Sequence, residues 1–584
     1  MIEYIRNISA GNRKTIFFLS LLPVLICFMY IWYYGVNVPY WDEWDNFPLI
    51  DKVLTGNFNF SMFYDQFNEH RIVLQRVTMV ILGILSSYNT KVDMYFSQIT
   101  MVIMVFILFI EFKRLLGQNF MALFVPIPYL AFSLMQAVNT LYAIQAVAYY
   151  SVFFSVLTFY LISRLDYCET RGKLILQCAL PIASALATSF TFTCGLMVWP
   201  VGFLQILISG IQKRLKIFML CVWPIMGAAT FLLYFSNYTH PTGSPPAMIF
   251  FKYPLQGLTY FSYLLGNILY AGRMVNLIAG IFIVLAAFLL FISIPFNKLP
   301  RYSFWIASFT YSFLAIFAIA FGRSTLDFEY LYLPIRYTTY GVVGPISLYV
   351  MYIGAVSDES SNTSIRYSKL VKCVFIVLFA VICSSIIPSY ESGYSQGVFW
   401  KGHREKVAYY TYTYKMQSDE NLKIVHPDPM IVRKYAPILE NRKYSVFTNP
   451  YLPPLDKLTS ANCTTTGFYT INAAQPNAHG QLFTIDDKQR YLSIIGWAID
   501  DLKKDIAGGV YIKIDDKLFP ALYGLDRVDV AEHLKINNYR YTGYNIEIPV
   551  SLIEKGTHKL SVLVLTNDKK HYFVPSVEVI VNRA

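Results

Sequence analysis

The stretch YWDEWD, at positions 40–45, gathers three carboxylates directly after the first apolar segment of the chain. In a helix, Asp42 and Asp45 would share one face, and Glu43 would lie about 100° away from them. Like charges on one helical turn tend to raise the pKa of one carboxyl group, which suits a general base acting on a hydroxyl. A solvated acidic loop is the alternative, and the sequence alone leaves both open.

A second polar group, NEHR at positions 68–71, follows in the same loop. We expect Glu69, His70 and Arg71 to contact a substrate, with the histidine orienting an acceptor. The bland alternative is an ion pair between Glu69 and His70. One histidine without fixed Cys/His spacing is a weak metal signal.

The third group is the stretch GRSTLDFEYLYLPIRYTTY, which follows an apolar segment. Its two arginines, Arg323 and Arg336, carry planar guanidinium groups that fit a phosphate, and Arg273 could join them. The alternative is salt bridging to Asp327 and Glu329 of the same stretch, or contact with lipid headgroups. The predicted substrate contacts beside these charges are Glu69, His70, Arg71 and Tyr337.

Composition indicates what kind of protein must position these groups. Hydrophobic residues make up 55% of the 584 residues, charged residues 14%, and the mean hydropathy is +0.43. Soluble chains carry about 25% charged residues. The net charge of +12 lies mostly in short loops between apolar segments, which argues against a nucleic-acid partner. The sequence therefore predicts a polytopic α-helical membrane protein in contact with the lipid bilayer.

The basic loops predict the topology, because Lys and Arg mark cytoplasmic ends. They place the N-terminus in the cytoplasm, the three polar groups on the outer face, and the two tryptophans of YWDEWD at the interface. The predicted inward ends carry Lys113/Arg114, Arg164/Arg171/Lys173, Lys213/Arg214/Lys216, Lys298/Arg301 and Arg366/Lys369/Lys372. The eleven predicted spans are 15–35, 95–112, 121–138, 146–164, 174–190, 195–211, 217–235, 274–295, 302–321, 339–356 and 371–389.

Two further apolar stretches, 71–87 and 255–272, would invert every later loop if they crossed the membrane. We predict that 71–87 is a surface helix within the first outer loop, 36–94. The stretch 255–272 is predicted to lie on the outer surface or to be re-entrant. The transmembrane domain then covers about residues 1–390.

The rest of the chain looks like soluble protein on the outer side of the membrane. Residues 391–479 form a Tyr-rich connecting region, with a weak helical pattern at 401–417 and Pro-broken loops at 427–454. From about 480 to 584, period-2 alternation predicts an antiparallel β-sandwich, with a short helical or loop insert at 527–535. The C-terminus would then be periplasmic in a bacterial inner membrane.

The motifs PYWDEWD, NEHR and GR…RYTTY together resemble those of the GT-C superfamily of membrane glycosyltransferases, with bacterial and phage-type O-antigen glucosyltransferases as the nearest functional class. The resemblance rests on an acidic motif after the first span, a long first outer loop with surface helices, and a C-terminal outer domain. It implies a polyprenyl-phosphate-linked sugar donor, a surface polysaccharide acceptor such as O-antigen, inversion at the anomeric carbon, and neither a metal ion nor another cofactor.

By the same resemblance, Asp42, Glu43 or Asp45 would be the catalytic base, and Arg323 and Arg336 would stabilise the departing phosphate. Two other functions stay open. One is an O-antigen polymerase or ligase that uses a pyrophosphate-linked glycan. The other is a transporter or flippase for lipid-linked sugars, in which the outer charges only recruit the substrate.

Overall fold

The computed structural model describes residues 12–165, 171–241, 249–269, 272–323, 335–359, 369–461, 464–471, 482–485, 488–574 and 578–583. The chain divides into two compact units, which we call the helical unit (Met1–Val36 and Leu49–Gly402) and the tail unit (Asn37–Pro48 and His403–Ala584). The stretch YWDEWD (40–45), which we call the acidic segment, thus groups with residues that follow it by more than 350 positions.

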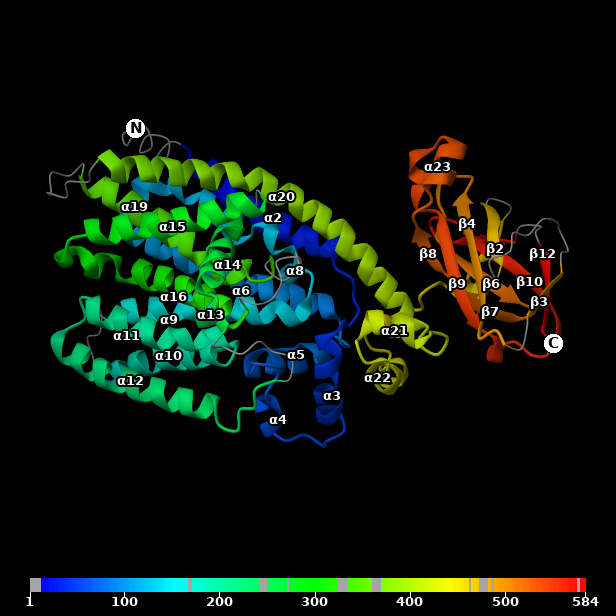
Figure 1. Cartoon of the computed structure of the whole chain (residues 1–584), viewed down its shortest axis with the longest axis horizontal. Coiled ribbons are helices and arrows are strands. Elements are labelled where there is room, and N and C mark those ends of the chain that lie inside the picture. Colours follow the sequence, from blue (N-terminus) through cyan, green and yellow to red (C-terminus); the bar gives the residue numbers. More distant parts are fainter. Residues whose placement is uncertain are drawn as a thin grey trace. The chain divides into compact units, whose positions relative to one another are not determined.

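The helical unit is built from helices and short 3-10 turns (Figure 1). Its helices are α2 (Arg13–Tyr34), α4 (Ser61–Tyr64), α5 (Val73–Leu85), α6 (Thr90–Leu116), α7 (Pro126–Ala131), α8 (Ala137–Thr140), α9 (Ala146–Ser163), α10 (Arg171–Ser189), α11 (Val198–Ile208), α12 (Lys213–Tyr234), α13 (Ile249–Lys252), α14 (Pro254–Gly266), α15 (Arg273–Ser293), α16 (Leu299–Arg323), α18 (Thr338–Gly341) and α19 (Val343–Glu359). Its turns are η1 (Gln118–Phe124), η2 (Leu134–Gln136), η3 (Ala143–Gln145), η5 (Thr193–Met197), η6 (Asn267–Leu269) and η7 (Phe296–Lys298). Two more helices, α3 (Asp42–Leu54) and α20 (Lys369–Tyr412), contain the boundaries between the units.

Within the described residues, eight helical segments are long and apolar enough to cross a membrane. They are Arg13–Tyr34, Phe120–Thr140, Ala143–Ser163, Lys213–Tyr234, Arg273–Ser293, Phe296–Arg323, Thr338–Ser357 and Lys372–Tyr412. The prediction of a polytopic helical membrane protein is confirmed at this level. Of the other three predicted spans, 95–112 lies in α6, and 174–190 and 195–211 lie in the shorter apolar helices Ile175–Ser189 and Thr193–Ile208.

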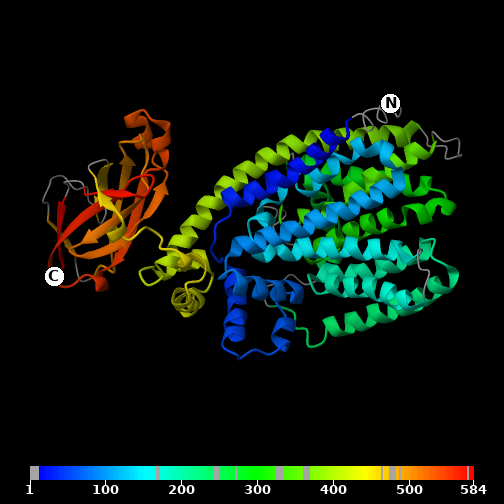
Figure 2. The same cartoon turned by 180° about the vertical axis from the view of Figure 1, so that it is seen from behind.

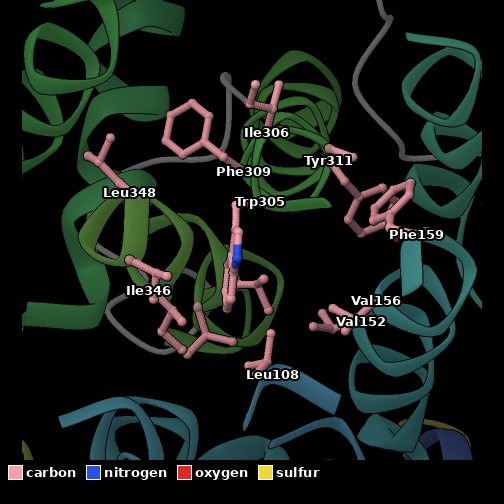
Figure 3. Close-up of a cluster of buried hydrophobic side chains, with 14 of the residues drawn as sticks. Leu108, Val152, Val156, Phe159, Trp305, Ile306, Phe309, Tyr311, Ile346 and Leu348 are labelled. Atoms are coloured by element: carbon pink, nitrogen blue, oxygen red, sulfur yellow. The ribbon is translucent and has the colours of Figure 1, made fainter. Parts of the chain in front are cut away.

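Large apolar side chains fill the centre of the helical unit. Trp305 of α16 is 1% exposed and lies among Leu108, Val152 and Ile346, which come from α6, α9 and α19 (Figure 3). At the edge of the bundle, α2 and α20 run side by side in both views (Figure 1, Figure 2), and the Tyr30 hydroxyl donates to the Gly393 carbonyl oxygen at 2.7 Å.

The two stretches predicted not to cross the membrane are short helices. α5 and α14 each have 13 residues, well below the roughly 20 residues that a span requires. α14 packs closely on α15, because Gly266 faces the backbone of Asn276 and Gly280 faces the backbone of Ser262. Only glycine leaves room for two helix backbones at this separation.

Three of the predicted cytoplasmic loops meet at one end of the helical unit, which we call the basic end. Buried Glu111 pairs with Arg114 of its own helix at 3.6 Å and with Arg164, at the end of α9, at 2.9 Å. Arg301, near the start of α16, donates to the Leu115 carbonyl oxygen at 2.8 Å. The ends of α6 and α9 and the start of α16 thus lie together, as the alternation of basic loops predicts.

The tail unit ends in two sheets. Its strands are β1 (Thr459–Ser460), β2 (Thr464–Ile471), β3 (Leu482–Ile485), β4 (Tyr491–Asp500), β5 (Asp505–Ile506), β6 (Gly509–Ile514), β7 (Lys517–Pro520), β8 (Leu522–Leu525), β9 (Gly543–Pro549), β10 (Gly556–Leu565), β11 (His571–Phe573) and β12 (Glu578–Arg583). One sheet has the order β2-β4-β9-β8 with β5 beside β4; the other has the order β1-β11-β10-β12-β3, and β6 lies between β10 and β7. Ile494 and Ile546 of the first sheet and Ile512 of the second belong to one core, so the two sheets form a sandwich. The prediction of an antiparallel arrangement is wrong for two strand pairs, because β1 runs parallel to β11 and β3 runs parallel to β12.

Helices and short turns accompany these sheets. They are α21 (Asp419–Val425), α22 (Pro429–Arg442), η8 (Ser445–Thr448), η9 (Leu455–Lys457), α23 (Val528–Leu534), η10 (Asn537–Tyr541) and η11 (Val550–Leu552). α23 confirms the predicted insert at 527–535. The expectation of Pro-broken loops at 427–454 is wrong for α22, because Pro429 occupies the first turn and the Asp428 carboxylate caps the Met430 N–H at 2.9 Å. The sheets also begin earlier than residue 480, since β1 and β2 precede it.

The contact between α14 and α15 predicts a strong effect of a single methyl group. In Gly280→Ala, the new Cβ would overlap the Ser262 carbonyl oxygen, so the two helices must separate. We expect the free energy of unfolding to fall by about 1–3 kcal/mol, the usual cost of overpacking. The detergent-solubilised variant should therefore unfold at a lower temperature than the unchanged protein. Gly402→Ala is the matched control, because nothing lies within 4 Å of that position. Equal thermal stability of the two variants would contradict the close packing.

Candidate functional site

At the end of the helical unit opposite the basic end, an ion pair joins two of the polar groups predicted from sequence. Glu69 Oε2 lies 2.8 Å from Arg323 Nη2, and both side chains are about four-fifths buried. Glu69 belongs to the loop before α5, and Arg323 is the last residue of α16. Two residues 254 positions apart thus form a charged contact at one end of the bundle.

His70 lies beside this pair in a defined orientation. Its ring stacks on Phe192 with 3.6 Å between centroids, and its Nδ1 lies 2.7 Å from the Thr193 hydroxyl. That hydroxyl donates to the Glu69 carbonyl oxygen, so it accepts from His70, and the Nδ1–H tautomer follows. Nε2 then carries a lone pair, 3.7 Å from the Glu69 carboxylate.

The electrostatics of the cluster keep His70 neutral. Burial lowers the pKa of His70 well below its ordinary value; Glu69 opposes this shift, and the positive charges of Arg323 and Arg336 add to it. The Glu69–His70 ion pair that the sequence left open therefore does not form near neutral pH. Glu69 instead pairs with Arg323.

Arg71 is held by backbone carbonyl groups. Its buried guanidinium donates to the Tyr234 carbonyl oxygen at 2.6 Å, to that of Tyr64 at 2.7 Å, and to that of Ser236. The first and last of these carbonyls lie at the C-terminal end of α12, where backbone acceptors have no helical partner. These contacts indicate a structural role for Arg71, although the sequence predicted a substrate contact.

Arg336 and Tyr337 lie just before α18, near the same cluster. The guanidinium of Arg336 lies 5.1 Å from the centre of the Tyr337 ring and donates to its hydroxyl at 3.1 Å. Asn139 fixes the backbone here, since its amide nitrogen donates to the Arg336 carbonyl oxygen at 2.7 Å and to the Thr339 hydroxyl at 2.8 Å. Arg336 is thus held by its own backbone and by an aromatic ring, at a position where its charge acts on His70.

The acidic segment lies in the tail unit, and its three carboxylates differ. Glu43 is 2% exposed and accepts a hydrogen bond from the Tyr40 N–H at 2.8 Å, which is the geometry of a helix cap. Asp42 and Asp45 open α3 and are more exposed. Asp42 and Asp45 are therefore the more accessible carboxylates of the segment, while Glu43 holds the start of the helix.

The two tryptophans of the segment do not behave alike, contrary to the prediction that both sit at a membrane interface. Trp44 is fully buried and donates to the Pro39 carbonyl oxygen at 3.0 Å, whereas Trp41 is 44% exposed. Trp41 precedes the helix and has a φ of 46°, which is strained for a bulky residue. Its N–H donates to the Val425 carbonyl oxygen at 2.9 Å, which holds the segment in this conformation.

Asp45 is paired with a histidine that the sequence did not single out. His426 Nε2 lies 3.3 Å from Asp45 Oδ1, and His426 Nδ1 lies 3.0 Å from the Asp428 carbonyl oxygen, to which it donates when protonated. Burial alone would lower the pKa of His426, but the hydrogen bonds and charges of Asp45 and Asp428 outweigh it and raise that pKa. A carboxylate oriented by a histidine is an arrangement that suits acid–base chemistry.

Two more residues of the tail unit lie against the segment. Arg404 is buried, 3.9 Å from the centre of the Tyr40 ring, and His403 Nε2 is within hydrogen-bond distance of the Tyr40 hydroxyl at 3.2 Å. No local motif marks these residues; the KGHREK run that contains them was the one available signal.

The remaining predicted residues have fewer described contacts. Arg273 opens α15 and is exposed. Asp327 and Glu329 lie outside the described residues, so the predicted alternative of salt bridges to them stays untested. In the described part of the chain, no group of three His, Cys, Asp or Glu side chains is arranged to hold a metal ion.

The predicted site residues therefore fall into two sets. Glu69, His70, Arg323 and Arg336 gather in the helical unit, and the acidic segment, with His426 and Arg404, gathers in the tail unit. A chamber that contains both sets stays a prediction.

The pairing of Asp45 with His426 predicts a pH-dependent contribution to stability. Because the folded-state pKa of His426 lies above the value of about 6.5 expected for the unfolded chain, the pair stabilises fully below that pH. The contribution is lost as the pH rises through the folded-state pKa. Thermal unfolding of Asp45→Asn should therefore differ most from that of the unchanged protein near pH 6, and less at pH 9. Asp51→Asn, on the same helix, is the control, and a difference that grows with pH would contradict the assignment.

Comparison of the chain with known protein families, with curated proteins and with solved structures finds no match of any of the three kinds. The likeness to GT-C glycosyltransferases rests on the short motifs quoted above.

Proposed function

We propose that the protein is an inverting glycosyltransferase that moves a sugar from a polyprenyl-phosphate carrier to a surface polysaccharide such as O-antigen. Glucose is the sugar that we expect it to move. The observation that carries the proposal is the gathering of Glu69, His70, Arg323 and Arg336 at one end of the helical unit. That end is opposite the basic end, so under the positive-inside rule it faces the periplasm of a bacterial inner membrane. The proposed topology has eleven crossings in a GT-C-like arrangement and a periplasmic C-terminus.

In this proposal Arg323 and Arg336 receive the donor phosphate. A phosphate gains negative charge as its bond to the sugar breaks, and guanidinium groups stabilise that charge. Arg323 is already oriented by Glu69, and Arg336 by its neighbouring ring and by the Asn139 contact to its backbone. Arg71 keeps the intervening loop on the end of α12 and takes no part in the chemistry.

The acceptor hydroxyl is activated by Asp42 or Asp45. Glu43 is excluded from this role because it is buried and bound to a backbone N–H. Asp45 is the better candidate for the base, because His426 orients its carboxylate. The transfer requires that the acceptor hydroxyl activated by this carboxylate meet the sugar whose phosphate Arg323 and Arg336 hold.

The test is transfer of labelled glucose from undecaprenyl-phosphate-glucose to a lipid-linked O-antigen glycan by the purified protein in nanodiscs. If Asp45 is the base, Asp45→Asn should lower kcat about 10²–10⁴-fold, the typical contribution of a positioned base. If Asp42 is the base, Asp42→Asn should show this loss instead. Arg323→Gln should lower kcat about 10²–10³-fold, as loss of one charge-stabilising donor does. Asp51→Asn, on the same helix as the two aspartates, should leave kcat unchanged.

The two other functions give different results in the same assay. A transporter or flippase yields no extended glycan even without a substitution. A polymerase or ligase is inactive with the monophosphate donor and active with a pyrophosphate-linked glycan. Full activity of both aspartate variants would overturn the proposed role of the acidic segment.

A further inference from the structure

A groove that none of the proposed chemistry uses lies between α2, α6, η1 and α7 of the helical unit. It has a volume of about 460 Å³, within the range of roughly 300–1,000 Å³ that ligand pockets occupy. It exists because the first half of α2 packs loosely: of its first ten residues only Ile16 is buried, whereas most of its buried residues lie in the second half.

The groove is apolar along its length and charged at one end. Phe17 and Leu21 of α2 face Val102 and Phe106 of α6 across it. Phe17 and Phe106 are 70% and 61% exposed, so the groove opens at the outer surface of the helices, where a bilayer would meet them.

Two cations stand at the charged end of the groove. Arg13 is the first residue of α2, and Lys113 lies in the last turn of α6. Neither forms an ion pair with another described residue, while the adjacent Arg114 is engaged with Glu111. The cations therefore lie at the basic end of the unit, next to a channel of apolar side chains.

We propose that this groove binds an anionic phospholipid of the leaflet at the basic end, with an acyl chain between α2 and α6 and the phosphate between Arg13 and Lys113. Charge complementarity favours a lipid with a negative headgroup over a zwitterionic one. A bilayer supplies such lipids, and basic residues at the cytoplasmic surface attract them. The lipid would fill the space that the loosely packed half of α2 leaves open.

The test measures binding of phosphatidylglycerol, phosphatidylcholine and undecaprenyl phosphate to the full-length protein in detergent by native mass spectrometry. We expect phosphatidylglycerol to bind best. The double variant Arg13→Gln/Lys113→Gln should lose about fivefold in affinity for each cation removed. Lys14→Gln is the matched control, because Lys14 is adjacent and exposed but does not line the groove.

A second pair of variants tests the apolar channel. Leu21→Trp should fill the groove and weaken binding of phosphatidylglycerol, whereas Leu25→Trp, on the same helix but outside the groove, should not. Unchanged binding in both the double variant and Leu21→Trp would overturn the proposal. Preferential binding of undecaprenyl phosphate would also overturn the proposal. Lipid binding that appears only after deletion of residues 2–11 would overturn it as well, because the amino-terminal segment would then be the occupant of the groove.

Discussion

Arginine side chains that bind the carbonyl oxygens at the ends of neighbouring helices hold the helical unit together at both of its ends. Arg71 binds the end of α12, Arg114 donates to the Ser163 carbonyl oxygen at the end of α9, and Arg301 binds the end of α6. These carbonyl groups have no partner in their own helices, and a guanidinium group has donors enough to satisfy several of them. Hydrogen bonds to a charged group contribute about 1.5–3 kcal/mol each, so they fix which helix ends lie together.

The two ends differ in what their carboxylates do. At the basic end, Glu111 is 4% exposed and accepts from Ser163 in addition to its two arginines, so its charge is balanced by local structure. At the other end, Glu69 is more exposed, and its neighbours are Arg323 and a neutral histidine with an open Nε2. The charges of two arginines, Arg323 and Arg336, act on this second arrangement, which is why we propose it as the site of the donor phosphate.

Much of this organisation could be predicted from the sequence, because hydrophobic length and basic loops follow from the physics of a bilayer. Hydrophobic length predicts that α5 and α14 are too short to cross the membrane, and the basic loops predict the common end of Arg114, Arg164 and Arg301. The β-sandwich follows from the period-2 alternation near the end of the chain. For Glu69 and Arg323, the sequence predicted only that both residues lie on the outer face of the membrane, and not that they form an ion pair.

What the sequence could not provide depends on contacts between distant residues. His426 and Arg404 follow the acidic segment by more than 350 positions and carry no motif of their own. The contacts of Arg71 with backbone carbonyl groups at the end of α12 could not be predicted, because no local pattern at the arginine indicates a helix end as its acceptor. The helix α22 was missed even though Asp428 and Pro429 form an ordinary start signal, since its prolines were read as breaks.

The proposed transfer requires that one lipid-linked sugar phosphate reach both Arg323 and Arg336 and the acidic segment. The most direct measurement is photocrosslinking of the full-length protein with a diazirine analogue of undecaprenyl-phosphate-glucose, followed by mapping of the labelled peptides by mass spectrometry. Our account predicts label both in the peptide that contains Asp42 and Asp45 and in those that contain Arg323 and Arg336, with competition by the unlabelled donor. Label that reaches only one of the two sets, or neither, would contradict it.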